Sequence, residues 1–589
     1  MVREKWVVSA KKADFNEWAE KFGISPVLAR IIRNRDVSDE EELKAYLKGD
    51  INDLHSPHLL KDMDKAADIL LEAVKNGEKI RVIGDYDVDG ICSTFIFTKG
   101  LSILGADCDH VIPHRIHDGY GLNDSLINDA KNEGIGLIAT CDNGIAAFGQ
   151  IELANTLGLK VVVTDHHEVP YEETDGVRHE ILPPALAVVD PKQEKCQYPF
   201  KNICGGVVVY KLMQVLCEKT GSEALKNTME EFLEFAALST VCDVMELRDE
   251  NRIIVREGIK RMKNSRNEGL KALISVNGLD PAGLSAYHLG FVIGPCLNAT
   301  GRLDSADRSI DLLMSYTKVD ALSNAGELKS LNDSRKNLTA SGTEKAVKYV
   351  EENHLEKDDV LVIYLPDVHE SLAGIIAGRI KELYNKPVFV LTNGEECVKG
   401  SGRSIEAYDM YEALNGVKDL FIKFGGHKMA AGLSLTADNV EVLRQRLNEK
   451  SNLSEEDFCK KILIDVPMPL SFANLELAKQ LNLLEPFGTG NPKPLFAEKD
   501  VRFVGCARIG KEGKYGKFTV INSAGTKDTL MYFGSLERFK EYADEKFGEG
   551  AFDKLLSGKG EMTLSIIYQL STNSFRGKEE KQFILTNFS

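Results

Sequence analysis

Residues 82–94 read VIGDYDVDGICST, a short apolar run followed by Asp85, Asp87 and Asp89 at alternate positions. Three carboxylates so close together repel one another unless a cation lies among them. If the backbone is extended there, the alternation points all three side chains the same way. The stretch therefore predicts a strand that ends in a cation-binding loop.

Three further segments place acidic or imidazole side chains in comparable contexts. They are TCDNGI at 140–145 with Asp142, VVVTDHHE at 161–168 with Asp165, His166 and His167, and STVCDVMEL at 239–247 with Asp243. The first two follow predicted strands, and the carboxyl ends of strands are where open α/β sheets bind ligands. Taken singly, each segment has an ordinary explanation, such as a turn or a buried hydrogen-bond acceptor. Together they supply carboxylate and imidazole ligands, which suit Mn²⁺ or Mg²⁺ better than a structural zinc, since zinc of that kind prefers thiolates.

The number of these side chains predicts two cations rather than one. A single ion that must also hold water and substrate does not need so many ligands. Two neighbouring ions can activate a water and clamp both the attacking and the leaving oxygen of a phosphate. We expect Asp142 to bridge them, because it lies between two ligand groups in chain order.

The chain around these motifs predicts an α/β protein. Helical stretches such as KAADILLEAVKNG alternate with apolar runs such as KIRVIG and KVVVT, a pattern typical of a parallel sheet covered by helices on both faces. A second α/β pattern opens at DDVLVIYLP, and short strands near the end suit an OB-type barrel. The expected domains are an N-terminal arm (1–60), a first α/β lobe (61–315), a connecting long helix (316–355), a second α/β lobe (356–450) and an OB-like β-barrel (455–589).

The composition limits the kinds of partner that the chain can bind. The net charge of -17 over 589 residues argues against a basic surface all round. The segment GKEGKYGKF is a local exception, and its side chains predict either a nucleic-acid groove or an ordinary charged hairpin: Lys511, Lys514, Tyr515, Lys517 and Phe518. Eleven cysteines without a CxxC pair, no secretory signal and no membrane-length apolar run favour a cytoplasmic protein without a membrane partner.

These segments resemble the DHH phosphoesterase superfamily, which is named for the triplet Asp165-His166-His167. Within it, further segments are similar, in the same order, to the bacterial RecJ exonucleases: IPHRIHDGYGL, CGGVVVYKL, GPCLNATGRLDSAD, GSGRSIEAYDM, FGGHKMAAGLSL and LEPFGTGNPKPLF. The resemblance runs from about residue 50 to the end. It implies a DHH phosphoesterase lobe, a helical linker, a DHH-associated second lobe and a C-terminal OB domain.

The resemblance also implies roles for individual residues. The metal ligands would be Asp85, Asp87, Asp89, Asp142, His166 and Asp243, holding two Mn²⁺ or Mg²⁺ ions. The catalytic set would be Asp142, His166, His167 and Arg302, with His167, Arg302 and Arg115 at phosphate oxygens. In the second lobe, Arg379, Ser401 and Arg403 would hold the 5′ end of the strand, and His427 would line the same cleft. One departure is Ile83, because the family often has a histidine two residues before the first aspartate of this motif.

The activity implied by the family is a metal-dependent 5′–3′ exonuclease, specific for single-stranded DNA, that releases 5′-mononucleotides in DNA repair and recombination. A helicase and a single-strand-binding protein would be partners of a monomeric enzyme. Two alternatives stay open at this point. One is a DHH phosphodiesterase acting on oligoribonucleotides or cyclic dinucleotides, and the other is a noncatalytic DNA-binding scaffold.

Overall fold

The computed structural model describes residues 3–114, 121–174, 177–575 and 577–589. The chain divides into two compact units. The larger unit consists mainly of His55–Met245 and Glu257–Lys460, and the smaller unit of Trp6–Leu54, Glu246–Arg256 and Lys461–Ser589. No helix in the described ranges is long and apolar enough to cross a membrane.

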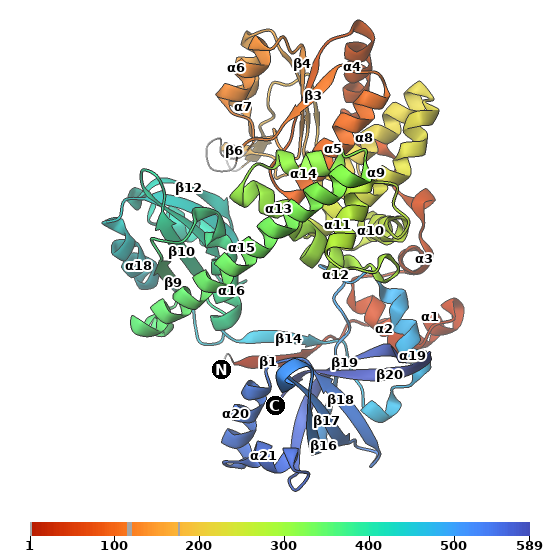
Figure 1. Cartoon of the computed structure of the whole chain (residues 1–589), viewed down its shortest axis with the longest axis vertical. Coiled ribbons are helices and arrows are strands. Elements are labelled where there is room, and N and C mark those ends of the chain that lie inside the picture. The colour runs from red at the N-terminus through yellow and green to blue at the C-terminus, as the bar shows by residue number, and fades with distance from the viewer. Residues whose placement is uncertain (1–2, 115–120, 175–176, 576) are drawn as a thin grey trace. The chain divides into compact units, whose positions relative to one another are not determined.

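The first lobe of the larger unit is built on a five-stranded parallel sheet of order β3-β2-β4-β5-β8 (Figure 1). Its strands are β2 (Ile80–Ile83), β3 (Cys108–Val111), β4 (Leu137–Cys141), β5 (Lys160–Thr164) and β8 (Ala187–Val189). Four of the five lie almost wholly buried, which explains their continuous apolar sequences.

Helices cover both faces of this sheet. The helices are α4 (Met63–Asn76), α5 (Val88–Ile103), α6 (Asp124–Asn132), α7 (Phe148–Thr156) and α8 (Gly205–Thr220). Helices α6 and α7 share a core with β4 and β5 on one face, while α5 and α8 contact the strands on the other. A short hairpin of β6 (Tyr171–Thr174) and β7 (Val177–Glu180) follows β5.

A helical layer and one long helix complete the first lobe. The helices are α9 (Glu223–Cys242), α10 (Asp249–Met262), α11 (Glu268–Val276), α12 (Ala286–His288), the π-helix η4 (Leu289–Ile293), α13 (Gly294–Leu303), α14 (Asp307–Leu313) and α15 (Lys318–Glu352). The residues of α10 up to Arg256 belong to the smaller unit. Helix α15 is 35 residues long and begins at a Thr317 cap whose hydroxyl accepts from the Asp320 amide. It packs on α11, α13 and α14 of the first lobe and on α16 (Ala373–Tyr384) of the second.

The second lobe carries a mixed sheet of order β12-β13-β11-β10-β9. The strands are β9 (Leu361–Tyr364), β10 (Val388–Asn393), β11 (Val398–Arg403), β12 (Phe421–His427) and β13 (Ala430–Leu435), and the further helices are η6 (Glu370–Leu372), α17 (Met410–Asn415) and α18 (Asn439–Glu449). Strands β9 and β10 are parallel and the remaining pairs are antiparallel.

The smaller unit contains a closed barrel in which β16 pairs with both β17 and β19. Its elements are β15 (Val466–Pro467), α19 (Leu475–Gln480), β16 (Phe496–Ile509), β17 (Tyr515–Ile521), β18 (Lys527–Tyr532), α20 (Leu536–Phe547), α21 (Ala551–Leu556), β19 (Met562–Phe575) and β20 (Lys578–Phe588). Three N-terminal helices, α1 (Phe15–Phe22), α2 (Pro26–Asn34) and α3 (Glu40–Lys48), share the hydrophobic core of this barrel. A two-stranded sheet joins β1 (Glu4–Val8) to β14 (Lys460–Ile464).

The predicted fold class is confirmed: a parallel α/β lobe, a long helix, a second α/β lobe and an OB-like barrel all occur. The domain boundaries proposed from the sequence stay a prediction. The contacts group the N-terminal helices with the barrel, an association that the sequence did not indicate.

Candidate metal centre at the sheet edge

The acidic motifs meet at the carboxyl edge of the parallel sheet. Asp85 follows β2, Asp142 follows β4 and His166 follows β5, while Asp243 caps the end of α9. The sheet order reverses between β2 and β4, since the chain passes from β2 to one neighbour and returns to the other. Open α/β sheets bind their ligands at such a switch point.

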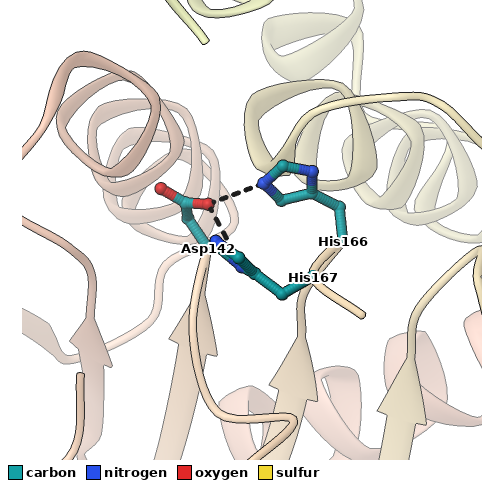
Figure 2. A group of neighbouring side chains, drawn as sticks. All are labelled: Asp142, His166 and His167. Carbon is teal, nitrogen blue, oxygen red and sulfur yellow. Dashed lines mark hydrogen bonds and ion pairs between the residues drawn. The ribbon is translucent and has the colours of Figure 1, made fainter. Parts of the chain in front are cut away.

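One carboxylate oxygen of Asp142 faces two neighbouring imidazoles (Figure 2). Its Oδ1 is 3.0 Å from Nε2 of His166 and 4.0 Å from Nδ1 of His167. The backbone of Asp142 has a φ of 62°, a left-handed conformation that non-glycine residues rarely adopt. Strain of this kind clusters at functional sites because the surrounding structure must hold it in place.

His166 gathers three carboxylates around one nitrogen. Besides Asp142, its Nε2 lies 3.4 Å from an oxygen of Asp89 and 3.7 Å from an oxygen of Asp243. The ring and the Asp89 and Asp142 side chains are almost completely buried. The structure thus brings together residues that are separated by more than 150 positions in the chain.

Asp89 is held by the N-terminus of α8. The backbone amides of Gly205 and Gly206 each donate to one of its oxygens at 2.8 Å, and the Ser239 hydroxyl donates as well. Helix N-termini favour negative charge because their first amides lack partners within the helix. These three donors therefore fix the orientation of the Asp89 carboxylate.

The condition under which Asp85, Asp87 and Asp89 would all point the same way, an extended backbone, is not met. Helix α5 begins at Val88, and the Asp87 side chain caps it by accepting from the Gly90 amide at 3.1 Å. Asp89 then lies in the first helical turn. Asp85 and Asp87 consequently share one group of potential ligands, while Asp89 belongs to another.

Three overlapping groups of side chains have the ligand atoms and spacing to hold metal ions. The groups, each with ligand atoms within 4.8 Å of one another, are Asp85–Asp87–Asp142, Asp142–His166–His167 and Asp89–His166–Asp243. All six residues predicted as metal ligands occur in these groups, and Asp142 occurs in two, as a bridging ligand would. Their coordination of a metal stays a prediction.

The electrostatics of the cluster favour a cation. Burial raises the pKa of Asp142 well above its usual value, and the neighbouring carboxylates, Asp89 first, raise it further. Burial and then the charges of Asp89 and Asp87 raise the pKa of Asp243 to about 8. Burial, followed by the charge of Asp89, likewise raises the pKa of Asp87. Ionised carboxylates in this place repel one another, and divalent cations would offset that repulsion.

Two buried atoms in the cluster also fit a metal site. Nδ1 of His166 and Oδ2 of Asp243 are buried and have no hydrogen-bond partner in the described part of the chain. Buried polar atoms are otherwise almost always satisfied. An oxygen-rich donor set with one or two imidazoles suits Mn²⁺ or Mg²⁺, so the residues present fit the predicted ions.

Asp165 holds the two histidines in place, a role that the sequence analysis did not assign. Its carboxylate accepts from the Ile145 amide at 2.9 Å, the His166 amide at 2.7 Å and Nδ1 of His167 at 2.7 Å. Burial alone would lower the pKa of His167, but the Asp165 hydrogen bond and charge outweigh it and raise the pKa to about 9. The Asp165 carboxylate therefore favours the charged form of His167. The position of Asp165 directly after a predicted strand was the sequence signal for this role.

Asp190 is a second buried carboxylate that sequence reasoning missed. It follows β8 on the same sheet edge, is fully buried and accepts from the Lys192 amide at 2.7 Å. Burial and the charge of Asp165 raise its pKa to about 8. The run ALAVVD carries the same strand-then-aspartate signal as the recognised motifs, so the pattern was available.

The predicted phosphate-binding residues lie on several elements. Arg302, at the end of α13, donates from Nη1 to the carbonyl of Ser371 at 2.8 Å, which ties the first lobe to the second. Arg403 and Ser401 lie on β11 and share a hydrogen bond of 3.2 Å. Arg379 on α16 and His427 at the end of β12 are exposed. Arg115 lies outside the described residues.

Arg335 on α15 is a further cation that the sequence did not single out. Its Nε and Nη2 both donate to Oδ1 of the buried Asn332, at 3.1 and 2.9 Å. Burial lowers its pKa, and the neighbouring positive charge of Arg379 lowers it further. Two guanidinium groups so placed make this face of the second lobe attractive to anions.

Part of the predicted nucleic-acid groove is corrected by the structure. Phe518 has no exposed surface, because it points into the barrel core against Phe503 and Phe539, and it therefore cannot stack on a base. Lys511, Lys514 and Lys517 are exposed, and Tyr515 is partly exposed beneath the Lys514 ammonium. Ile83, the departure from the family motif, is fully buried in the core between the sheet and α6.

The fold and the site define the class of this protein as a phosphoesterase of the DHH type. Three family models match the chain: the DHH family N-terminal domain over residues 79–240, the DHHA1 domain over 357–452 and the RecJ OB domain over 464–587. The *Escherichia coli* single-stranded-DNA-specific exonuclease RecJ is 31% identical over 584 residues, which cover 96% of each chain. The chain therefore belongs to the RecJ family.

Other relatives agree with this assignment. The *Bacillus subtilis* single-stranded-DNA-specific exonuclease RecJ is 34% identical over 533 residues, which cover 90% of this chain and 66% of the length of that relative. The crystal structure of RecJ from *Thermus thermophilus* with Mn²⁺ has a TM-score of 0.80 and 27% identity, and the match covers 100% of this chain and 80% of that one. A structure of the same protein with Mg²⁺ has a TM-score of 0.74.

Proposed function

We propose that this protein is a metal-dependent exonuclease that degrades single-stranded DNA from the 5′ end and releases 5′-mononucleotides during DNA repair and recombination. The observation that carries the proposal is the convergence of Asp87, Asp142, His166 and Asp243 at one sheet edge. A relative named as a single-stranded-DNA-specific exonuclease, RecJ of Escherichia coli, matches the chain over nearly its whole length. Mn²⁺ and Mg²⁺, which the Thermus structures contain, are the proposed ions.

The ligand groups give each side chain a task. When bound, two divalent cations would supply a nucleophilic water at neutral pH and neutralise charge on the phosphate. Asp142 shares its carboxylate between two groups, with Asp85 and Asp87 on one side and His166 on the other. Asp89, fixed by the α8 amides, orients the ligands around His166.

His167 and Arg302 are the proposed phosphate contacts in the first lobe. Because Nδ1 of His167 is committed to Asp165, Nε2 is the nitrogen that donates to a phosphate oxygen. The hydrogen bond and charge of Asp165, which raise the pKa of His167, favour the charged form of that donor. A charged donor offsets the negative charge that builds up in the transition state.

The second lobe and the barrel would set the direction of digestion and the preference for single-stranded DNA. Arg379, Ser401, Arg403 and His427 are the proposed contacts for the terminal phosphate, where planar guanidinium groups bind two oxygens at once. Lys511, Lys514, Lys517 and Tyr515 of the smaller unit are proposed to contact the strand further along. A helicase and a single-strand-binding protein are the proposed partners of this enzyme, which we propose to be monomeric. The eleven free cysteines suit a reducing cytoplasm.

Digestion of end-labelled DNA tests the proposal. Single strands and duplexes labelled at the 5′ or the 3′ end are incubated with Mn²⁺, Mg²⁺ or EDTA, and Asp142→Ala is the inactive control. We expect labelled mononucleotide at once from the 5′-labelled single strand and only late from the 3′-labelled one. Faster hydrolysis of dinucleotides than of long strands would indicate a small-substrate phosphodiesterase, and no metal-dependent release at all would indicate a noncatalytic scaffold.

A further inference from the structure

Two aromatic side chains of the larger unit are stacked on each other and open to solvent. Tyr287 and Phe291 have ring centroids 5.1 Å apart with 26° between their planes. They are 62% and 69% exposed, respectively. Single exposed apolar residues are common, but two rings already in parallel stacking geometry offer flat outer faces on which a third ring can stack.

The rings lie on an unusual piece of backbone. Tyr287 is in the single turn of α12, and Phe291 is in η4, a π-helix of five residues. Helical turns of this kind are rare and occur frequently at functional sites. Tyr287 and Phe291 are four residues apart, a spacing that places both rings on one side of a helix, and they contact each other.

This π-helix packs on the part of α9 that leads into the metal centre. The thiol of Cys242 donates to the carbonyl of Leu289 at 3.6 Å, and a methyl group added at Gly290 would lie 3.3 Å from the Val241 side chain. The next residue after Cys242 is Asp243, a member of the ligand cluster. The helical segment that carries the stacked rings is thus packed on the wall of the metal centre.

The same run of helix continues to the phosphate side of the site. Helix α13 follows η4 directly and ends near Arg302. A methyl group added at Gly301 would lie 2.6 Å from the Tyr86 carbonyl, so α13 contacts the loop between Asp85 and Asp87. Phe291 and Arg302 are 11 residues apart, roughly 16 Å along a helix that rises about 1.5 Å per residue.

We propose that Tyr287 and Phe291 form a stacking platform for the bases of the strand that enters the metal centre. The inference rests on the proposed function and adds a recognition element to it. Bases of a single strand can unstack and lie on protein rings, whereas bases inside a duplex are covered by their neighbours. Stacking ignores base identity, so the platform selects single strands over duplexes without selecting a sequence.

Binding measurements without metal test the platform separately from catalysis. The probe is a single-stranded oligonucleotide carrying 2-aminopurine, studied in EDTA so that it stays intact, beside an oligonucleotide of equal length whose internal sugars lack bases. Each stacked base contributes about 5- to 150-fold in affinity. We expect Tyr287→Ala/Phe291→Ala to bind the base-bearing strand at least 10-fold more weakly than wild type, with less 2-aminopurine quenching. Its affinity for the abasic strand should match wild type.

Two control variants and a short substrate make the result decisive. Tyr287→Leu/Phe291→Leu keeps apolar bulk but removes the flat rings, and it should behave like the alanine variant. Tyr316→Ala removes a ring that is 91% exposed elsewhere in the same unit, and it should bind like wild type. Hydrolysis of p-nitrophenyl thymidine 5′-phosphate should be unchanged in both double variants, because that substrate is too short to reach the rings.

The outcomes separate the platform from the proposed function. Equal loss of affinity for base-bearing and abasic strands, or no loss for either, would overturn the platform while leaving the exonuclease proposal intact. If the wild-type protein releases no nucleotide from any strand, the proposed function fails first.

Discussion

Replacing Gly205 with alanine adds one methyl group where α8 meets the ligand cluster. The new carbon would lie 2.8 Å from Cβ and 3.1 Å from Cα of Asp142, closer than such atoms approach in proteins. Asp142 has little room to withdraw, because its backbone is in the left-handed region and its amide donates to the Thr164 carbonyl. The alternative is a shift of α8, whose first amides hold Asp89.

The expected losses of stability and turnover follow from the overlap between the added methyl group and Asp142. Normal carbon contacts require roughly 1 Å of movement from this position, and overpacking of that kind costs about 1–3 kcal/mol of stability. A displacement of about 1 Å among catalytic groups reduces turnover on the order of 100-fold. We therefore expect Gly205→Ala to lower the thermal midpoint modestly, weaken Mn²⁺ activation and reduce kcat about 100-fold.

The assay is mononucleotide release from single-stranded DNA across a Mn²⁺ titration, with thermal unfolding in parallel. Gly149→Ala is the matched control, since Gly149 lies in helix α7 with no atom within 4 Å of the added methyl. That substitution should be neutral or stabilise by up to about 1 kcal/mol with unchanged activity. Wild-type Mn²⁺ dependence and turnover in Gly205→Ala would refute the packing argument.

Four further outcomes follow from the structure. Burial raises the pKa of Glu234 from 4.5 to about 7, so the stability that its protonated form contributes is complete below pH 4.5 and is lost as the pH rises through 7. From acid pH to pH 8, the free energy of unfolding of Glu234→Gln should therefore rise by about 3 kcal/mol relative to that of the wild type. Urea-unfolding profiles against pH that run parallel for the two proteins would contradict this. Mn²⁺ binding near pH 7 should release protons, because the pKa of Asp243 is about 8 in the metal-free site. Binding heats measured by calorimetry should then differ between buffers of different ionisation enthalpy, and identical heats would speak against proton release. Phe518→Ala should destabilise the smaller unit by about 3–5 kcal/mol, whereas Lys517→Ala should weaken DNA binding and leave stability unchanged. Thermal unfolding and anisotropy titrations measure the two effects, and a stable Phe518→Ala beside a destabilised Lys517→Ala would contradict the assignment. Asp165→Asn should reduce kcat/KM about 10- to 100-fold by releasing the two histidines, and an unaltered rate would rule out that role.

The position of the site could be predicted from the sequence, because β-branched runs mark where buried strands end and polar residues follow them. Asp142 and His166 were found in this way. The local geometry could not be predicted. Asp87 caps a helix instead of continuing a strand, and the Asp89 carboxylate is fixed by the Gly205 amide, 116 residues away in the chain.

The smaller unit shows the same division between local pattern and long-range packing. Trp18 and Leu28 share a core with Phe496 of the barrel, and nothing in the polar N-terminal sequence indicated that partner. The burial of Phe518, by contrast, was available, since Gly516, Phe518 and Val520 alternate with exposed or partly exposed residues in one strand. The alternation in this strand is therefore a better guide to the burial of Phe518 than the basic and aromatic composition of the segment.

Diffraction from crystals grown with Mn²⁺, recorded at the manganese absorption edge, tests the central claim most directly. We expect two anomalous peaks that share Asp142 as a ligand, one with Asp87 and one with His166 and Asp243 beside it. A cluster without any peak, or ions bound only elsewhere on the surface, would contradict the account.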